Sequence, residues 1–456
     1  MVFSSSVFLL LFLPIVIAIY YNPVIKARSF RNIFLLLASL LFYAWGEPIY
    51  VFIMLATIAV NWGLALKINK TKLIMAIILD IGLLFVYKYA NFTAANLGLP
   101  VPGIALPIGI SFFTFQMVSY MVDVYRSKAQ AQRSFLSCAL YISLFPQLIA
   151  GPIIRYADIE EQLNNRKETW DDFCEGLKRF TVGLGKKMLI ANNCALAADA
   201  AFDTLKNGSE IGIAFAWLGA IAYTLQIFFD FSGYSDMAIG LGRMFGFRFL
   251  ENFNYPYISA SITEFWRRWH ISLSSWFRDY VYIPLGGSRV STKLRLFMNL
   301  LVVWMLTGIW HGANWTFIAW GLGYFVFLAS EKFFLPISKF PKPLAHIYTM
   351  LIVICLWVVF RANSLGDAVD YYIAMFGFGN SPLITEDFWF YLNSLKLYFA
   401  FGILFCFPIV KRIETKFPSL STLNSPLSTI AYTILFILCF MSVVKGGYNP
   451  FIYFNF

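Results

Sequence analysis

Charged residues are scarce in this chain. Asp, Glu, Lys and Arg make up only 13% of its 456 residues, whereas hydrophobic residues make up 59% and the mean hydropathy is +0.69. Because a soluble domain needs a far more polar surface, this composition predicts a polytopic membrane protein. The net charge of +11 comes from small Lys and Arg clusters between apolar runs. It therefore indicates membrane topology, and nucleic acid is excluded as a partner.

Closely spaced cysteines and internal repeats are also lacking. The six cysteines stand mostly in apolar context without CxxC spacing, so neither a metal site nor a disulfide framework is predicted. No repeat, heptad pattern or low-complexity linker divides the chain. We therefore expect a single membrane domain over residues 1–456.

Apolar runs of membrane-spanning length are plentiful, and they predict an all-α fold with twelve crossings. The first run has no basic residue ahead of it and no cleavage site behind it, so we expect it to be retained. The runs are 7–21, 33–45, 49–66, 73–90, 104–122, 181–199, 211–231, 296–312, 313–331, 344–361, 396–410 and 427–444.

Lys and Arg cluster in alternate connections, which sets the expected orientation, because cytoplasmic loops are enriched in these residues. The connection 362–395 carries four acidic residues and no basic residue, so it is expected outside. Both termini, including the tail 445–456, are then extracytoplasmic. The clusters assigned to the cytoplasm are Lys26, Arg28 and Arg31; Lys67, Lys70 and Lys72; Arg126, Lys128 and Arg133; Lys332, Lys339 and Lys342; and Lys411, Arg412 and Lys416.

Two segments differ from simple crossings. The uncharged run 135–154 is interrupted by Pro146, Gly151 and Pro152, and it predicts a re-entrant segment buried in protein. Segment 243–295 combines many arginines with tryptophans, which is typical of interfacial helices on the cytoplasmic side. The sequence Pro284-Leu-Gly-Gly287 is expected to end the helical part of this second segment.

Histidine is the rarest side chain of chemical interest. The chain has three, and His270 and His311 stand in strongly aromatic and apolar context. An imidazole exchanges protons near neutral pH, whereas hydrocarbon gives it no structural reason to be present. We interpret both as candidate catalytic groups, and a packing or headgroup contact is the alternative for His270.

Several dense motifs resemble the membrane-bound O-acyltransferase family, in particular its bacterial branch that O-acetylates alginate and peptidoglycan. The resemblance covers nearly the whole chain, and the motifs are specific only in combination. They are Gly151-Pro-Ile-Ile-Arg155-Tyr156, Gln226-Ile-Phe-Phe-Asp230-Phe-Ser-Gly233-Tyr234-Ser235-Asp236, Glu251-Asn-Phe-Asn254-Tyr-Pro256-Tyr257, Trp266-Arg-Arg-Trp-His270, Trp276-Phe-Arg278-Asp279, Trp310-His311-Gly312 and Pro450-Phe-Ile-Tyr453-Phe454.

The resemblance implies a ring of about 11–13 transmembrane helices around a central tunnel in a bacterial cytoplasmic membrane. It implies acetyl-CoA as the donor substrate, entering from the cytosol, with no bound cofactor. His311 is the implied catalytic base, which agrees with the need to activate an acceptor hydroxyl. It also implies an extracytoplasmic acetyltransferase partner protein that completes transfer to a polysaccharide.

Two interpretations are open for several of the remaining candidate residues. Arg267, Arg268 and Arg278 suit the phosphates of the donor or anionic lipid. Tyr453 is either an acyl carrier, as the resemblance implies, or an aromatic residue of the outer membrane interface. Further donor-binding or tunnel candidates are Arg155, Trp266, Asp279, Asp230, Tyr234 and Asn314.

Three questions stay open from the residues. Buried carboxylates need partners, so Asp230 and Asp236 are expected to pair with Arg243 or Arg155. A lipid or protein acceptor is an alternative to a polysaccharide. A transporter is the rival class, although no paired repeats of the kind that transporters contain are visible.

Overall fold

Every regular element in the described part of the chain is helical, as the composition predicts. The computed structural model describes residues 1–456 apart from residues 25, 380, 418–424, 447, 451 and 453–456. The helices belong to two compact units. The first unit is Met1–Gly183 with Tyr234–Glu251, and the second is Leu184–Gly233 with Asn252–Phe456. The expected single domain stays a prediction.

The first unit contains short helices interrupted by π-helical turns, together with the end of α12. An ionic network buries Glu168, which accepts hydrogen bonds from Tyr20, Arg28 and Arg31. Its elements are η1 (Phe8–Phe12), α1 (Leu13–Tyr20), α2 (Arg28–Ala44), α3 (Tyr50–Ala65), α4 (Lys70–Leu84), η2 (Phe85–Tyr89), α5 (Ala90–Asn96), α6 (Ile110–Tyr125), α7 (Phe135–Ser143), α8 (Phe145–Leu148), α9 (Tyr156–Asn165) and α10 (Trp170–Gly185).

The expected break in run 135–154 is confirmed, because α7 ends at Ser143 and α8 starts again at Phe145. Side-chain hydroxyl groups form hydrogen bonds with backbone groups that the break leaves without a helical partner. The Tyr141 hydroxyl donates to the Ile154 carbonyl at 2.9 Å, and the Phe145 N–H donates to the Ser39 hydroxyl at 3.1 Å. Irregular backbone is tolerated away from water only when it is satisfied in this way. Its re-entrant course through a bilayer stays a prediction.

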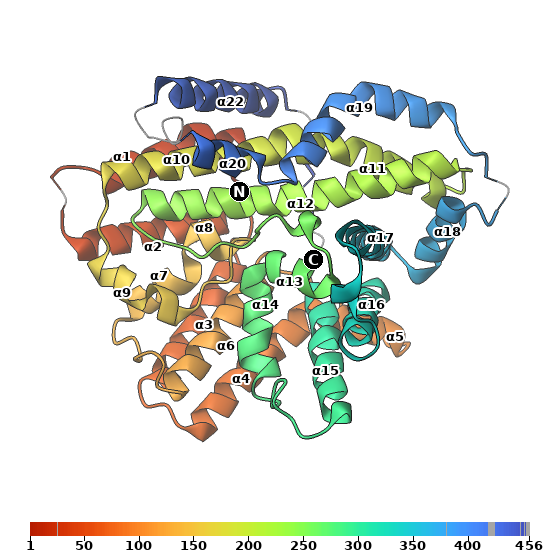
Figure 1. Ribbon diagram of the computed structural model, residues 1–456. Helices are drawn as coiled ribbons and strands as arrows, with labels where there is room; N and C mark the ends of the chain where they lie inside the picture. The colour runs from red at the N-terminus through yellow and green to blue at the C-terminus, as the bar shows by residue number, and fades with distance from the viewer. Residues whose placement is uncertain (25, 380, 418–424, 447, 451, 453–456) are drawn as a thin grey trace. The chain divides into compact units, whose positions relative to one another are not determined.

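The second unit begins at Leu184, near the end of α10, and includes α12 as far as Gly233; both helices are labelled in Figure 1. Its elements are η3 (Lys186–Ala191), α11 (Asn192–Lys206), α12 (Ile213–Met244), η4 (Pro256–Ile258), α13 (Ile262–Arg268), α14 (Ile271–Phe277), η5 (Arg278–Tyr282), α15 (Lys293–His311), α16 (Trp315–Phe333), η6 (Ile337–Lys339), α17 (Lys342–Arg361), α18 (Leu365–Phe376), α19 (Glu386–Phe405), α20 (Ile409–Lys416) and α22 (Pro426–Val444).

Helices α15 and α16 touch backbone to backbone (Figure 1). A Cβ atom on Gly308 would stand 2.5 Å from the Phe317 carbonyl oxygen, and one on Gly321 would stand 2.5 Å from the Trp304 carbonyl oxygen. Small residues at such crossings allow apolar helices to approach closely. The contact lies three residues before His311, so it fixes the end of α15 against α16.

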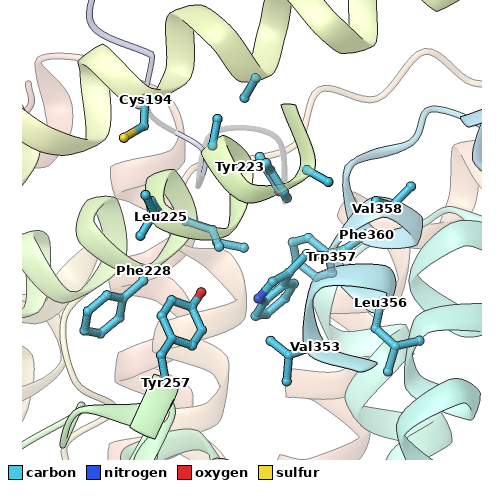
Figure 2. Packing of buried hydrophobic residues seen from close by; sticks show 14 of the residues in the cluster. Cys194, Tyr223, Leu225, Phe228, Tyr257, Val353, Leu356, Trp357, Val358 and Phe360 are labelled. Carbon is cyan, nitrogen blue, oxygen red and sulfur yellow. The ribbon is translucent and has the colours of Figure 1, made fainter. Parts of the chain in front are cut away.

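An aromatic core fills the second unit, and Figure 2 shows part of it. Trp357 and Phe360 of α17 pack with residues of α12, and the Tyr257 hydroxyl donates to the Thr224 carbonyl at 2.6 Å. Trp266 and Trp269 belong to the same core and are at most 7% exposed. Both tryptophans therefore pack in this core. The position of segment 243–295 at the cytoplasmic membrane interface stays a prediction. The helical part of this segment does end at the Gly286–Gly287 turn, where both glycines have positive φ.

In the part of the chain that the structure describes, six helices combine the length and apolar composition needed to cross a bilayer, so the chain is a multi-pass membrane protein by these criteria. All twelve predicted runs contain helix, but the others are shorter or more polar. The number of crossings therefore stays a prediction. The six candidate spans are Lys70–Asn96, Ile213–Met244, Lys293–His311, Lys342–Arg361, Glu386–Phe405 and Pro426–Val444.

Two boundaries differ from the sequence prediction. Helix α19 begins at Glu386 and not at residue 396, because Glu386 and Asp387 occupy its first turn, where the helix dipole favours acidic residues. Helix α6 begins at Ile110 and not at residue 104, because Gly109 before it has a left-handed φ of 80°. Both differences come from end effects that hydropathy does not register.

Substituting Gly321→Ala should destabilise the protein by about 1–3 kcal/mol, because the added methyl group meets the α15 backbone. The measurement is the apparent melting temperature in detergent. Gly82→Ala in α4 is the matched control, since its Cβ would meet nothing within 4 Å. Equal melting temperatures for the two variants would contradict the close helix contact.

Candidate active site

His311 is the last residue of α15, and it lies in an aromatic enclosure. Its ring meets Trp310, Trp320 and Phe360 edge to face, at centroid distances of 5.0, 4.8 and 5.3 Å. These rings come from α15, α16 and α17, and His311 is only 6% exposed. Gly312 then continues in extended conformation and ends the helix. The imidazole is therefore held between three helices.

A small cavity reaches this imidazole. It has room for about one water molecule, about 10 Å³, so a larger reactant needs the walls to move apart. A carboxylate, Asp230, is among the mostly apolar walls. The lining residues are Ile227, Asp230, Phe231, Trp269, His311, Trp357, Phe360 and Ile452. The expected central tunnel stays a prediction.

Asp230 forms a buried ion pair with Lys187, with Nζ and Oδ1 2.7 Å apart and both side chains at most 3% exposed. The other carboxylate oxygen, Oδ2, accepts the Ile452 N–H at 3.1 Å. The Lys187 ammonium also donates to the Pro450 carbonyl. This ion pair ties the chain end to α12 and η3 and places Ile452 in the wall of the His311 cavity. The expected pairing of Asp230 with Arg243 or Arg155 is wrong.

His270 stands at the start of α14 in a left-handed conformation, with φ of 43°. Its ring packs edge to face on Phe231 at 4.5 Å and lies 6.1 Å from Trp310. Phe231 also lines the His311 cavity, and Trp310 also contacts His311. The two candidate histidines therefore share two aromatic neighbours.

Asn252 decides the state of the His270 ring. The Ser272 backbone N–H donates to the Asn252 side chain at 3.2 Å, so the accepting atom must be the amide oxygen. His270 Nδ1 lies 3.1 Å from the same oxygen and must therefore carry a proton. In the neutral ring Nε2 is then an acceptor, and it has no hydrogen-bond partner among the described residues.

Burial supports the same protonation state. The His270 ring is fully buried and lies outside the six candidate spans. Burial lowers the pKa of His270 to about 3, because a charged ring loses its hydration in the core. His270 is therefore neutral at physiological pH.

The other predicted residues of the second unit fall into distinct surroundings. Trp266 is buried against Trp304 and Trp320, so it supports the wall behind His311. Asn314 caps α16, because its side chain accepts the Thr316 N–H at 3.1 Å. Arg278 and Asp279 pair with each other at 2.7 Å. None of these four belongs to the cavity lining.

The two arginines of α13 have different surroundings. Arg267 is exposed, whereas Arg268 pairs with Glu264 at 2.9 Å and donates to the Asn254 carbonyl at 3.1 Å. Their assignment to a donor or to lipid stays a prediction.

Arg155 and Tyr234 belong to the first unit, whereas His311 belongs to the second. Arg155 precedes α9, and Tyr234 stacks on Phe3 at 4.6 Å. Asp236 pairs with Arg179 at 2.6 Å, a partner that the sequence did not predict. Tyr453, the predicted acyl carrier, lies outside the described residues.

Sequence reasoning missed Lys187 and Asn252 as site residues. Lys187 stands inside the apolar run 181–199, where a lysine needs a carboxylate partner. That position was the available signal. Asn252 gave no signal of its own, because its role depends on the unusual backbone of His270. Among the described residues, no group of three or more His, Cys, Asp or Glu could hold a metal ion.

An all-α membrane protein with a histidine on an interior cavity has the features of an enzyme that transfers protons away from bulk water. The chain belongs to the MBOAT, or membrane-bound O-acyltransferase, family, whose model matches residues 35–366. It is therefore a multi-pass membrane O-acyltransferase. The rival interpretation as a transporter is wrong.

Curated relatives agree with the family. The chain is 46% identical to the probable alginate O-acetylase AlgI of Azotobacter vinelandii, over 84% of this chain and 79% of that protein. It is also 46% identical to the probable alginate O-acetylase AlgI of Pseudomonas aeruginosa, over 84% and 76% of the two chains. A peptidoglycan O-acetyltransferase of Helicobacter pylori is 35% identical, over 84% and 81%.

Replacing Asp230 by Asn should destabilise the protein by roughly 3–5 kcal/mol, because it leaves the Lys187 ammonium buried without its carboxylate. The matched variant, Lys187→Met with Asp230→Leu, removes both charges and should lose much less. Apparent melting temperatures in detergent measure both. If the double variant is destabilised more than Asp230→Asn, the loss of stability does not come from leaving the Lys187 charge unpaired.

The buried neutral His270 should make stability depend on pH. The unfolded ring has its ordinary pKa of 6.5, so at pH 5 it binds a proton that the folded ring does not. Stability is therefore lost as pH falls from 7 to 5, by on the order of 2 kcal/mol from this group. His270→Asn keeps a donor near Nδ1 and tolerates the positive φ. Melting curves should show a smaller acid loss in this variant, and an equal loss would contradict the assignment.

Proposed function

We propose that the protein transfers an acetyl group from acetyl-CoA to a hydroxyl group, and that this reaction supplies O-acetyl groups to an extracellular polysaccharide. The single observation that carries the proposal is the imidazole of His311 on an interior cavity beside Asp230. The names of the relatives support the acceptor class, since they specify alginate and peptidoglycan. They favour a polysaccharide over a lipid or protein acceptor.

His311 acts as the general base in this proposal. One of its ring nitrogens takes the proton of the acceptor hydroxyl while the oxygen attacks the thioester carbonyl. The tetrahedral intermediate then collapses, its C–S bond breaks, and the thiolate takes the proton from the imidazolium. The products are the acetyl ester and the free thiol of coenzyme A. The aromatic enclosure keeps water away, which limits hydrolysis of the thioester.

The surroundings of His311 suit the charge that forms during the reaction. The ring stands at the C-terminus of α15, where the helix dipole stabilises a cation. The Asp230 carboxylate lines the same cavity, but the Lys187 ammonium offsets its charge. The helix dipole therefore favours the transient imidazolium over the resting state, which lowers the barrier to proton removal.

His270 has a positioning role in the proposal. Its Nδ1 is committed to Asn252, and its ring supports Phe231 and Trp310, which contact the His311 site. Its Nε2 is left to accept a hydrogen bond from a substrate group. A catalytic part for His270 thus rests on Nε2 alone.

The chain end is the proposed exit for the acetyl group. Ile452 lines the His311 cavity, and Tyr453 follows it in sequence with a phenolic hydroxyl that can accept an acyl group. In this scheme the enzyme lies in the bacterial cytoplasmic membrane with both termini outside. Tyr453 then passes the acetyl group to an extracytoplasmic acetyltransferase partner, which acts on the polysaccharide.

The proposal predicts that His311→Ala lowers acetyl transfer by about 10²–10⁴-fold, the usual contribution of a general base. Purified protein in lipid nanodiscs is incubated with ¹³C-acetyl-CoA, and free coenzyme A and the mass of the C-terminal peptide are measured. His346→Gln is the matched control, because His346 lies 3.1 Å from the Ser259 carbonyl and does not line the His311 cavity.

If the folded His311→Ala protein transfers acetyl groups at an unchanged rate, His311 is not the general base. Coenzyme A release without label on Tyr453 under turnover conditions removes the carrier step and leaves the transferase intact.

A further inference from the structure

A second cavity in the same unit is basic, and no residue of the His311 cavity lines it. It measures about 490 Å³, within the range of small-molecule sites. Four cationic side chains converge on it from α13 and α20, which are far apart in sequence. The lining residues are Asn254, Tyr255, Ile258, Arg268, Pro408, Lys411, Arg412, Thr415 and Lys416.

The positive charge of this basic pocket is poorly compensated. Arg268 pairs with Glu264 at 2.9 Å. Lys411, Arg412 and Lys416 have no carboxylate within ion-pair distance among the described residues. The eight-residue helix α20 carries these three cations and one carboxylate, Glu414, which leaves a net charge of +2, and Arg412 and Lys416 repel each other one turn apart. A bound anion would remove that repulsion.

The loop that forms the other wall is held in place before any ligand binds. The Asn254 N–H donates to the Arg268 carbonyl at 2.9 Å, and the Arg268 side chain returns a bond to the Asn254 carbonyl at 3.1 Å. Tyr255 is left-handed, with φ of 48°. Such backbone conformations cost energy in residues other than glycine and cluster at ligand sites. The wall is therefore preorganised around Arg268.

The number of positive charges at the basic pocket indicates which class of anion it binds. A phospholipid headgroup with one phosphodiester carries one negative charge, whereas the net charge of +2 on α20 matches a ligand with more than one phosphate. Arginine binds phosphate through two parallel N–H donors, and lysine adds mobile point charges. Both residue types are present at the basic pocket. A ligand with two or more phosphate groups therefore fits better than a single headgroup.

We infer that the basic pocket binds the phosphate-bearing nucleotide end of the acyl donor. This inference rests on the proposed function, because that function supplies a donor with phosphates at the end remote from its thioester. The pocket takes part in no bond making or breaking. It should therefore govern the affinity for the donor and leave the chemical step at His311 unchanged.

The test uses the full chain in phosphatidylcholine nanodiscs with adenosine 3′,5′-bisphosphate as the probe. Lys411→Glu with Arg412→Glu should weaken binding of this nucleotide by about tenfold or more, since two charge-assisted contacts are replaced by repulsion. The KM for acetyl-CoA should rise similarly, with the rate at saturation within about twofold. Lys339→Glu with Lys342→Glu is the matched control, because these exposed cations lie outside the pocket.

Two results would overturn the assignment. If wild type and the pocket variant bind the nucleotide with equal affinity, the basic pocket is not the nucleotide-binding site. A thermal stabilisation by phosphatidylglycerol nanodiscs that the pocket variant loses, without any nucleotide effect, assigns the pocket to a lipid headgroup instead. Failure of the proposed function is separate, because it shows as no acetyl transfer from acetyl-CoA by wild type, whether or not the nucleotide binds.

Discussion

The buried ion pair between Lys187 and Asp230 is the interaction on which the candidate site depends. Two charges away from water are costly unless each has a partner and further hydrogen bonds. Here the carboxylate also accepts the Ile452 N–H, and the ammonium also donates to the Pro450 carbonyl. The pair therefore fixes η3, α12 and the chain end together. Because Asp230 and Ile452 both line the His311 cavity, the same interaction shapes the place where chemistry is proposed.

Close helix packing supplies the second constraint. Gly308 and Gly321 allow α15 and α16 to approach until a methyl group would not fit. This brings Trp320 within 4.8 Å of the His311 ring, and α17 adds Phe360. A histidine at the end of a helix would otherwise be free to turn toward solvent. The aromatic enclosure limits its orientation and excludes water, and both effects favour proton transfer to a bound hydroxyl over hydrolysis.

His270 shows how far residue chemistry leads before geometry is known. Its rarity and its aromatic neighbours in the sequence single it out as a functional candidate. The structure adds that Asn252 fixes the proton on Nδ1 and that the backbone is left-handed at this position. Neither feature follows from hydropathy or motif spacing. The tryptophans beside it are a similar case, since an aromatic composition fits both a membrane interface and a protein core, and only the structure shows that Trp266 and Trp269 pack in the core.

The sequence by itself determined the all-α class, the helical runs, the break at residues 135–154, the family and the two histidines. Each of these depends on residues close together in the chain, such as apolar length, proline and glycine positions, or short motifs. Only the tertiary structure decided that Asp230 pairs with Lys187, that Asn252 orients His270, and that Arg268 shares a pocket with α20. Charges as far apart in sequence as Lys187 and Asp230, 43 residues, can pair in many ways. Burial selects one pairing because every alternative would leave a charge uncompensated away from water.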